Sequence, residues 1–341
     1  MAALAIVTSS PPETEGGHLV IARSLVQAAR DAGHDARLVT TPDYGFGRQT
    51  RSYLANYRTD VGDVDEVISL RYPSYAVRHS HHVCWLTHTM REYYDQWPQF
   101  SGSISPANRV KETVRRTLTH IVDAHLLKRH VQKLCAISET VRGRVAHDFG
   151  LDAEVIYPPP PQRPYRCDAY GDFVFAVSRL MPLKRLDLLV RALAEPRALG
   201  VRAVIAGDGE CRDELARLAQ TLGVADRVTF LGRIDETALL DHLARCRAVC
   251  FTPRDEDYGF VAVEAFASRK PVVTCRDSGG PAEVVRDNET GFVCDASAAA
   301  VAESLGRLMD DRALAERLGS AAAARAAAMT WDAVVRRLLI V

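Results

Sequence analysis

Residues 255–267 read DEDYGFVAVEAFA, from Asp255 to Ala267, and this stretch decides the fold. It follows an apolar run, Ala248 to Phe251, that is typical of a buried parallel strand. A polar turn then leads into a helix that we expect to begin near Gly259. A strand, a turn and a helix in this order predict one unit of a parallel α/β sheet.

Two carboxylates bracket the expected start of this helix. Glu256 lies in the turn, and Glu264 lies about two turns into the helix. The N-terminus of a helix carries unpaired N–H groups and partial positive charge, so it can hold an anion. A carboxylate inside the helix can also accept two hydrogen bonds from a ribose diol. The arrangement therefore favours a sugar nucleotide over a bare phosphate.

The alternative is that Glu256 is an ordinary loop charge and Glu264 an ordinary solvated helix residue. The neighbours of Glu264 weaken this alternative, because residues 261–263 and 265–267 are all apolar. A carboxylate in so apolar a helix needs a partner, since an unpaired buried charge is costly.

The bulk composition is that of an ordinary globular protein. A length of 341 residues predicts about two domains. Because 43 basic residues balance 43 acidic ones, no overall charge points to a nucleic-acid partner. The first ten residues lack a basic leader and are expected to form a strand, not a signal peptide. No apolar run approaches the roughly 20 residues of a membrane span.

Neither cysteine nor histidine spacing predicts a metal site. The eight cysteines are scattered and form no C-x-x-C pair, so we expect reduced thiols in a cytoplasmic protein. His79, His81 and His82 precede a strand, where alternating side chains point to opposite faces. We therefore expect no metal there.

A proline run, Pro158 to Pro161, with Pro164 beyond it, divides the chain. Proline extends neither a sheet nor a helix, so we predict domains at 1–164 and 165–328, with a closing helix at 329–341. Strands and helices alternate on both sides of the boundary. Each half is therefore expected to be a doubly wound sheet that binds ligands at the carboxyl ends of its strands.

The first half offers two candidate contacts at strand ends. Gly16 and Gly17 stand where the first loop meets a helix, which lets a ligand approach the backbone, although such a pair is often only a turn. His88 follows the strand 83–86 and is either a ligand contact or a structural histidine.

The helical stretch 106–135 carries seven basic side chains and two acidic ones. The excess lies between Arg109 and Lys133 in an otherwise neutral chain. It is either a solvated face or a surface that meets an anionic acceptor or an anionic membrane.

Taken in order, these motifs resemble the family-4 retaining glycosyltransferases of the group 1 type. The motifs are Gly16-Gly17, Ser178-Arg179 with Lys184, Gly207-Asp208-Gly209, Glu256-x7-Glu264, and Gly279-Gly280 with Glu283. The resemblance covers nearly the whole chain and is strongest over residues 173–292. It implies the GT-B fold, in which two Rossmann-like doubly wound domains face a cleft.

The run Cys84 to His88 also resembles a subgroup associated with bacterial surface polysaccharides, in which the position of Thr87 is often histidine. The family's last helix usually crosses back to the first domain. This chain ends soon after Trp331, so we expect a short or truncated closing helix.

The resemblance implies a role for each candidate residue. Arg179 and Lys184 match the basic pair that neutralises the leaving diphosphate, and Glu256 matches the glutamate near the transferred sugar. Glu264 matches the glutamate that holds the ribose. The remaining donor contacts are expected at Gly16 and Gly17 beside the diphosphate, at the backbone of Arg233 and Ile234 for the base, at the amides of Phe260 and Val261, and at His88 for the donor sugar.

The implied activity is retaining sugar transfer from a UDP- or GDP-sugar, by front-face attack and without a metal or other cofactor. Two cations and a helix dipole can stabilise the diphosphate. The acceptor is open: a saccharide, a lipid-linked sugar or a small molecule, in polysaccharide or glycoconjugate biosynthesis. The alternatives are a GT-B sugar-nucleotide epimerase and a non-catalytic nucleotide-binding protein. A dehydrogenase is disfavoured because no G-x-G-x-x-G follows the first strand.

Overall fold

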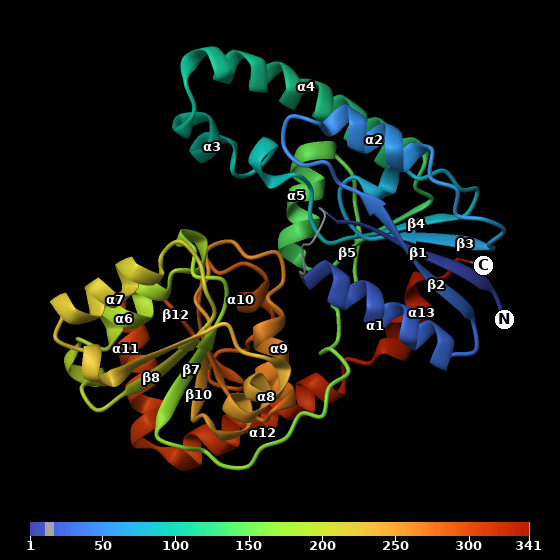
Figure 1. The fold of residues 1–341 in the computed structure, drawn as a ribbon. Helices are drawn as coiled ribbons and strands as arrows, with labels where there is room; N and C mark the ends of the chain where they lie inside the picture. The colour runs from blue at the N-terminus through green and yellow to red at the C-terminus, as the bar shows by residue number, and fades with distance from the viewer. Residues whose placement is uncertain (11–16, 341) are drawn as a thin grey trace. The chain divides into compact units, whose positions relative to one another are not determined.

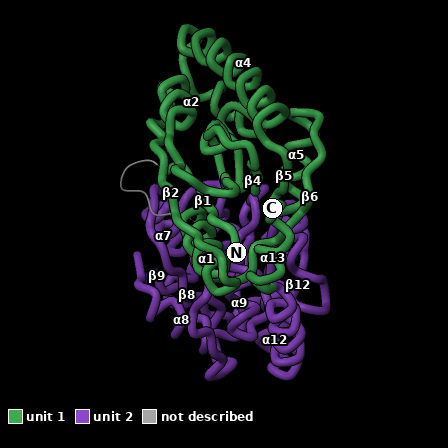
Figure 2. The backbone as a smooth tube through the Cα atoms, turned by 90° about the vertical axis from the view of Figure 1, so that its right-hand side faces the viewer, with its two compact units in different colours: residues 1–161, 330–341 green, residues 162–329 purple. Residues whose placement is uncertain are grey.

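The computed structural model describes residues 1–10 and 17–340. It divides into two compact units, which Figure 2 colours separately. Unit 1 contains residues 1–161 and 330–341, and unit 2 contains residues 162–329. Across the described ranges, no helix has both the length and the apolar character that a membrane crossing requires.

Unit 1 is a six-stranded parallel sheet flanked by helices (Figure 1). Its strand order is β2-β1-β3-β4-β5-β6. The strands are β1 (Ala3–Ser10), β2 (Asp35–Pro42), β3 (Glu66–Ser69), β4 (His82–Leu86), β5 (Lys133–Ala136) and β6 (Glu154–Val155). The helices are α1 (Gly17–Asp31), α2 (Gln49–Tyr57), α3 (Trp97–Ser103), α4 (Pro106–Arg129), α5 (Glu139–Phe149) and α13 (Trp331–Leu338).

The last helix of the chain, α13, packs against the first, α1. Its Trp331 is buried, donates its indole N–H to the carbonyl oxygen of Pro160 at 3.0 Å, and meets the ring of Trp85 edge-on. Arg337 reaches the carboxylate of Glu154 at the edge of the sheet. The C-terminal segment therefore completes unit 1 although it follows unit 2 in the sequence.

Unit 2 repeats this architecture with strand order β12-β11-β10-β7-β8-β9, again all parallel. Its strands are β7 (Phe173–Val177), β8 (Arg202–Ala206), β9 (Val228–Gly232), β10 (Ala248–Cys250), β11 (Val272–Cys275) and β12 (Gly291–Cys294). Its helices are α6 (Leu186–Ala192), α7 (Arg212–Thr221), α8 (Glu236–Arg245), α9 (Phe260–Ala267), α10 (Gly280–Val284), α11 (Ala298–Asp310) and α12 (Arg312–Ala327). The predicted pair of Rossmann-like doubly wound folds is thus confirmed.

The alanine-rich stretch 296–328 forms two helices, α11 and α12, instead of one continuous helix. Asp311 has non-helical backbone angles, and its carboxylate accepts a hydrogen bond from the amide of Leu314 at 2.9 Å. An aspartate in this position caps a new helix, so the capping residue outweighs the alanine propensity around it.

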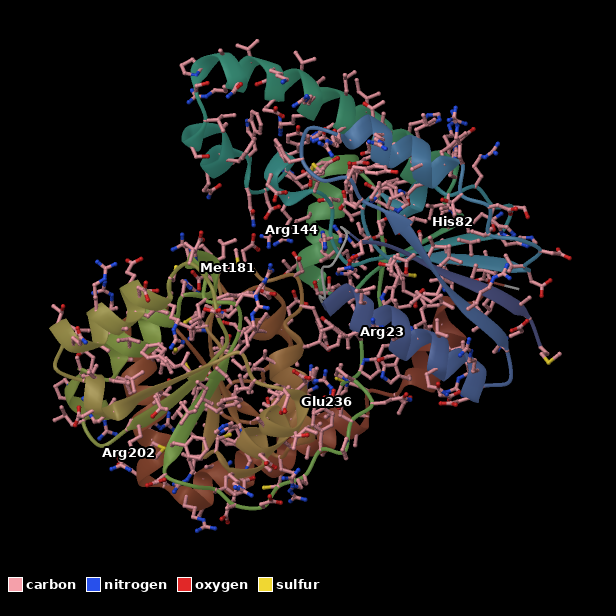
Figure 3. All side chains as sticks on the ribbon, in the orientation of Figure 1. Arg23, His82, Arg144, Met181, Arg202 and Glu236 are labelled. Carbon is pink, nitrogen blue, oxygen red and sulfur yellow. The ribbon has the colours of Figure 1, made fainter. Side chains whose placement is uncertain are left out.

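In a doubly wound sheet, ligands bind where successive connections diverge to opposite sides. In unit 2 the chain leaves β7 toward β8, whereas β10 lies on the other side of β7. The loops after β7 and β10 therefore flank the expected crevice. Met181, in the loop after β7, and Arg202, the first residue of β8, mark opposite ends of this sheet (Figure 3).

Candidate functional site

The two loops that flank the unit 2 crevice are joined by an ion pair. Lys184 ends the short 3₁₀ turn after β7, and Glu256 lies in the loop between β10 and α9. The ammonium nitrogen of Lys184 lies 2.5 Å from Oε2 of Glu256, and only 14% and 22% of the two side chains are exposed. Sequence analysis proposed both residues for the site, and the fold brings them into contact across 72 positions of sequence.

Arg185, to which the sequence analysis gave no role, holds these loops together. Its guanidinium donates to the carbonyl oxygens of Thr252 and Pro253 after β10, at 2.8 and 2.6 Å. It also makes two hydrogen bonds, of 2.7 and 2.6 Å, with the carboxylate of Asp277 after β11. Arg185 keeps the pKa of that carboxyl below its usual range. A buried arginine therefore fixes the framework on which Lys184 and Glu256 stand.

Two glycines allow the loops to approach closely. Gly259 has φ 83°, and a Cβ atom there would lie 2.6 Å from the ring of Phe251. Gly279 has φ 69°, and its Cβ would lie 2.5 Å from the carbonyl oxygen of Glu256. Both positions need a backbone conformation and a clearance that only glycine provides without strain. They set the start of α9 and the path of the Glu256 loop.

Glu264 lies in the fifth position of α9 and is buried, with 7% of the residue exposed. Its Oε1 is paired with the guanidinium of Arg163 and lies 3.3 Å from the hydroxyl of Tyr165. Burial raises the pKa of Glu264 to about 7, and the charge of Arg163 and the Tyr165 hydroxyl oppose this rise. The expectation that this carboxylate needs a partner was therefore correct, but the partners found come from this chain.

The other predicted donor contacts of unit 2 are accessible. Arg179 is exposed, and its guanidinium makes no ion pair or hydrogen bond with any residue that the structure describes. Arg233 and Ile234 lie between β9 and α8 and are exposed and partly exposed. Phe260 and Val261 form the first turn of α9, whose N-cap residue Gly259 offers no side chain to their amides.

In unit 1, Gly17 is the first residue of α1, while Gly16 lies outside the described residues. His88 follows β4 and its Nδ1 lies 2.8 Å from the carbonyl oxygen of Thr89. His18, in the first turn of α1, lies close enough to Arg71 and His88 that burial and their charges lower its pKa to about 3. His18 is therefore neutral at pH 7. Its position directly after the glycine pair was the one available sequence signal.

Arg71, which follows β3, was not selected from the sequence. Its guanidinium donates to the carbonyl oxygen of Ser9 at the end of β1 and pairs with Asp43, both at 3.1 Å. Only 9% of Arg71 is exposed. Because β1 and β3 are neighbours, Arg71 lies at the carboxyl end of the unit 1 sheet, where its charge helps to lower the pKa of His18.

The histidine cluster at the start of β4 has structural partners. His79 and His81 contact backbone carbonyl oxygens of Val64 and Asp65. His82, labelled in Figure 3, is buried against the hydroxyl of Ser69, and burial lowers its pKa to about 3. Within residues 1–10 and 17–340, no three His, Cys, Asp or Glu side chains are grouped so that they could hold a metal ion.

Most of unit 2 matches a known protein family. Residues 168–325 match the family described as glycosyl transferases group 1. This match contains the loops after β7 and β10, Arg185 and the whole of α9.

Two curated relatives are similar to part of the chain. D-inositol 3-phosphate glycosyltransferase of Nocardia farcinica is 39% identical over 173 residues, which is 48% of this chain and 38% of that protein. GDP-mannose-dependent alpha-(1-6)-phosphatidylinositol monomannoside mannosyltransferase of Mycobacterium tuberculosis is 33% identical over 228 residues, 59% of each chain. The chain thus spans 38% and 59% of the length of these two relatives.

Solved structures match over nearly the full length. Sucrose-phosphate synthase from Thermosynechococcus elongatus superposes with a TM-score of 0.75 at 18% identity, covering 98% of this chain and 97% of the other. HepE from Anabaena, solved with UDP and glucose, superposes with a TM-score of 0.69, also at 18% identity and with the same coverage. This chain therefore has the GT-B type of fold, built from two Rossmann-like units, and its residues 168–325 match the group 1 glycosyl transferases.

Proposed function

We propose that this protein is a retaining glycosyltransferase that moves a sugar from a UDP- or GDP-sugar to an acceptor. The observation that carries the proposal is the Lys184–Glu256 pair at the switch point of a group 1 glycosyl transferase domain. It puts a cation and a carboxylate where a doubly wound sheet binds nucleotides. The nucleotide-sugar donor is further supported by relatives whose names state a GDP-mannose dependence or a complex with UDP-glucose.

Each site residue has a distinct part in this proposal. Lys184 and the exposed Arg179 neutralise the leaving diphosphate, which then leaves without a metal. The uncapped amides of Phe260 and Val261 add the positive end of α9. Glu256 stands beside the transferred sugar, where positive charge develops as the glycosidic bond breaks.

The rest of the donor has its contacts at other positions of the chain. Glu264 holds the ribose, and the backbone of Arg233 and Ile234 receives the base. The contacts expected in unit 1, from His88 and from Gly16 and Gly17, stay predictions of the resemblance. The acceptor is then a saccharide, a lipid-linked sugar or a small molecule, and the anomeric configuration is retained by front-face attack.

A panel of sugar nucleotides tests this function directly. The protein is incubated with UDP-, GDP-, ADP- and TDP-sugars, with and without EDTA, and released nucleoside diphosphate is measured with candidate acceptors. We expect release from a UDP- or GDP-sugar that depends on the acceptor and survives EDTA. Conversion of the donor to an epimer, or binding without turnover over the whole panel, would contradict transfer. Loss of activity with EDTA that magnesium or manganese restores would contradict only the metal independence.

We also propose that α4 holds the protein at the inner face of a membrane. Val110, Val114, Leu118 and Ile121 recur along one side of α4, and each is more than half exposed. Figures 1 and 2 show α4 at the periphery of unit 1, with α2 beside it. An apolar stripe on a basic helix is typical of a helix that lies in a membrane interface.

The charges on α4 support this orientation. All residues of the helix are described, and its two acids, Glu112 and Asp123, are buried. Glu112 pairs with Arg115, and Asp123 accepts hydrogen bonds from buried tyrosine hydroxyls. The charged side chains that remain exposed are all basic: Arg109, Lys111, Lys128 and Arg129. Such residues favour anionic lipid by about 1 kcal/mol each near the surface. The eight free thiols agree with a cytoplasmic location.

Vesicle sedimentation tests the membrane contact. We expect binding to anionic phosphatidylglycerol vesicles at low salt, weaker binding at physiological salt, and little binding to neutral phosphatidylcholine. The double variant Leu118→Asp, Ile121→Asp should lose binding. The matched control Leu199→Asp changes an exposed leucine of unit 2 and should not. If the unmodified protein stays in the supernatant with anionic vesicles at low salt, the α4 face is only a solvated surface.

A further inference from the structure

The partners of Glu264 come from the segment that directly follows the proline run. Arg163 pairs with Oε1 of Glu264, and the hydroxyl of Tyr165 approaches the same oxygen at 3.3 Å. The other face of Arg163 is held by Glu236, the first residue of α8, whose Oε2 lies 2.9 Å from Nε. Glu236 is labelled in Figure 3. Two residues of one short segment thus converge on one oxygen of one buried carboxylate.

The segment is fastened again directly after these contacts, so Arg163 is positioned by the fold. Arg166 is paired with Asp241 of α8. Further along, the buried ammonium of Lys270 donates to the carbonyl oxygen of Ala169, and the Tyr170 hydroxyl donates to the carbonyl oxygen of Arg269. The segment therefore runs from α8 to the end of α9 as a fixed part of unit 2.

The geometry leaves the second oxygen of Glu264 available. Both side-chain contacts are made to Oε1, and Oε2 accepts no hydrogen bond from any residue that the structure describes. A carboxylate can accept about four hydrogen bonds over its two oxygens. A ribose diol can therefore bind Oε2 while Arg163 and Tyr165 stay in place.

We propose that Arg163 and Tyr165 are positioning residues for nucleotide binding, which hold Oε1 of Glu264 so that an ionised Oε2 faces the ribose. The proposal rests on the function proposed above, in which Glu264 binds the ribose. Without the guanidinium, this carboxylate would stand almost unpaired in an apolar helix. It would then take up a proton instead of keeping its charge.

The groups that act on this carboxyl set the direction of its titration. Arg163 and Tyr165 face it from the segment after the prolines, and Glu236 faces it from the start of α8. The first two lower the pKa of Glu264 and the third raises it, against the larger effect of burial, which brings it to about 7. Protonation removes an acceptor and negative charge from Oε2, so nucleotide binding should weaken as pH falls through this pKa.

The test is the affinity for UDP and GDP, measured by calorimetry between pH 6 and pH 9.5. We expect Arg163→Gln to move the pH midpoint of binding upward by one unit or more, which is about tenfold weaker binding at pH 7. Tyr165→Phe should move the midpoint upward by less. Glu236→Gln should move it downward, because a neighbouring negative charge is lost. The matched control Arg166→Gln, in the same segment but paired with Asp241, should leave the midpoint unchanged.

The variant Glu264→Gln distinguishes the positioning role of Arg163 and Tyr165 from the proposed function on which it rests. This variant should bind weakly at every pH, and adding Arg163→Gln to it should cause no further loss. If the unmodified protein binds neither UDP nor GDP, the proposed function fails first. If it binds them but Arg163→Gln and Tyr165→Phe keep its pH midpoint, the positioning role is refuted. Should Arg163→Gln not fold, Tyr165→Phe and Glu236→Gln still give midpoint shifts of opposite sign.

Discussion

Replacing Glu264 by glutamine should make the ligand-free protein more stable and make it a poorer nucleotide binder. Burial raises the pKa of Glu264 from 4.5 to about 7. Between these values the folded protein holds a proton that the unfolded chain has released, so the free energy of unfolding falls as pH rises. Above pH 7 the loss is complete. The side chain is only 9% exposed, so solvent screening removes little of this effect.

The magnitude follows from the difference of about 2.5 between the two pKa values. At 1.36 kcal/mol per pH unit it corresponds to roughly 3 kcal/mol of lost stability at pH 8. Glutamine has nearly the same shape and no charge, so it avoids this loss but gives up the ion pair with Arg163. Arg163 keeps its second partner, Glu236, at 2.9 Å. We therefore expect Glu264→Gln to raise the free energy of unfolding at pH 8 by about 1–2 kcal/mol.

Urea unfolding followed by circular dichroism at pH 5, 6, 7, 8 and 9 measures this difference. The curves of the unmodified protein and Glu264→Gln should converge toward pH 5, separate between pH 5 and pH 7, and run parallel above pH 7. The matched control is Glu236→Gln, which changes the more exposed acid on the same arginine and should shift stability by less than about 0.5 kcal/mol. A Glu264→Gln variant that is less stable at pH 8, or whose offset from the unmodified protein is the same at pH 5 as at pH 8, would refute the reasoning. Calorimetry should show weaker nucleoside diphosphate binding for Glu264→Gln, whereas Glu256→Gln should mainly lower turnover.

Lys184→Met and Glu256→Gln should each cut turnover about 100-fold. Because the two side chains are in contact, turnover of the double variant should fall within about tenfold of that of the worse single variant. A loss of about 10⁴-fold in the double variant would show that the two residues act separately. Arg179→Ala should also cut turnover about 100-fold. Its free energy of unfolding should stay within about 0.5 kcal/mol of that of the unmodified protein, because the Arg179 guanidinium is exposed. Near-normal rates would remove the role of Arg179 at the diphosphate. Arg185→Gln should lower the free energy of unfolding by about 2–4 kcal/mol in urea, because two loop carbonyl oxygens lose their donor, and an unchanged midpoint would contradict its framework role. Arg185 depresses the pKa of Asp277, so the ion pair between them stabilises the protein above about pH 4 and this stabilisation is lost as pH falls. Between pH 5 and pH 3, Asp277→Asn should therefore lose less stability than the unmodified protein. Equal losses of stability would exclude the ion pair.

The sequence predicted those parts of the fold that depend on local pattern. Apolar runs such as Phe173 to Val177 alternate with helical periods, and this alternation was enough to predict two parallel sheets. The family resemblance selected Lys184, and the local pattern placed it and Glu256 after strand ends before their contact was known. Local pattern failed at Asp311, where one capping side chain divides a stretch that propensity alone would make continuous. The stretch 44–57 had no clear pattern, and it contains α2.

The partners of buried charges could not be predicted in the same way. Arg163 and Glu264 are separated by 101 positions, and Arg71 and Ser9 by 62. An arginine beside prolines carries no local mark of the helix that it will contact, because that contact depends on how α8 and α9 pack. The apolar neighbours of Glu264 indicated that a partner must exist, since an unpaired charge there is too costly. They did not indicate which of the chain's 43 basic residues it would be.

The two glutamates of the stretch 255–267 differ in how much their ionisation depends on protein partners. Glu256 lies in a loop, partly exposed, and its cation Lys184 stands across the crevice. Glu264 lies inside an apolar helix, where burial opposes its charge and Arg163 restores part of it. In the proposed function, Glu256 answers a charge that develops in the transition state and is held in place beside Lys184, whereas Glu264 holds the ribose before and during the reaction. In the proposed function, the burial of Glu264 fixes the carboxylate that holds the ribose, and its cost in stability is the reason that it needs an arginine.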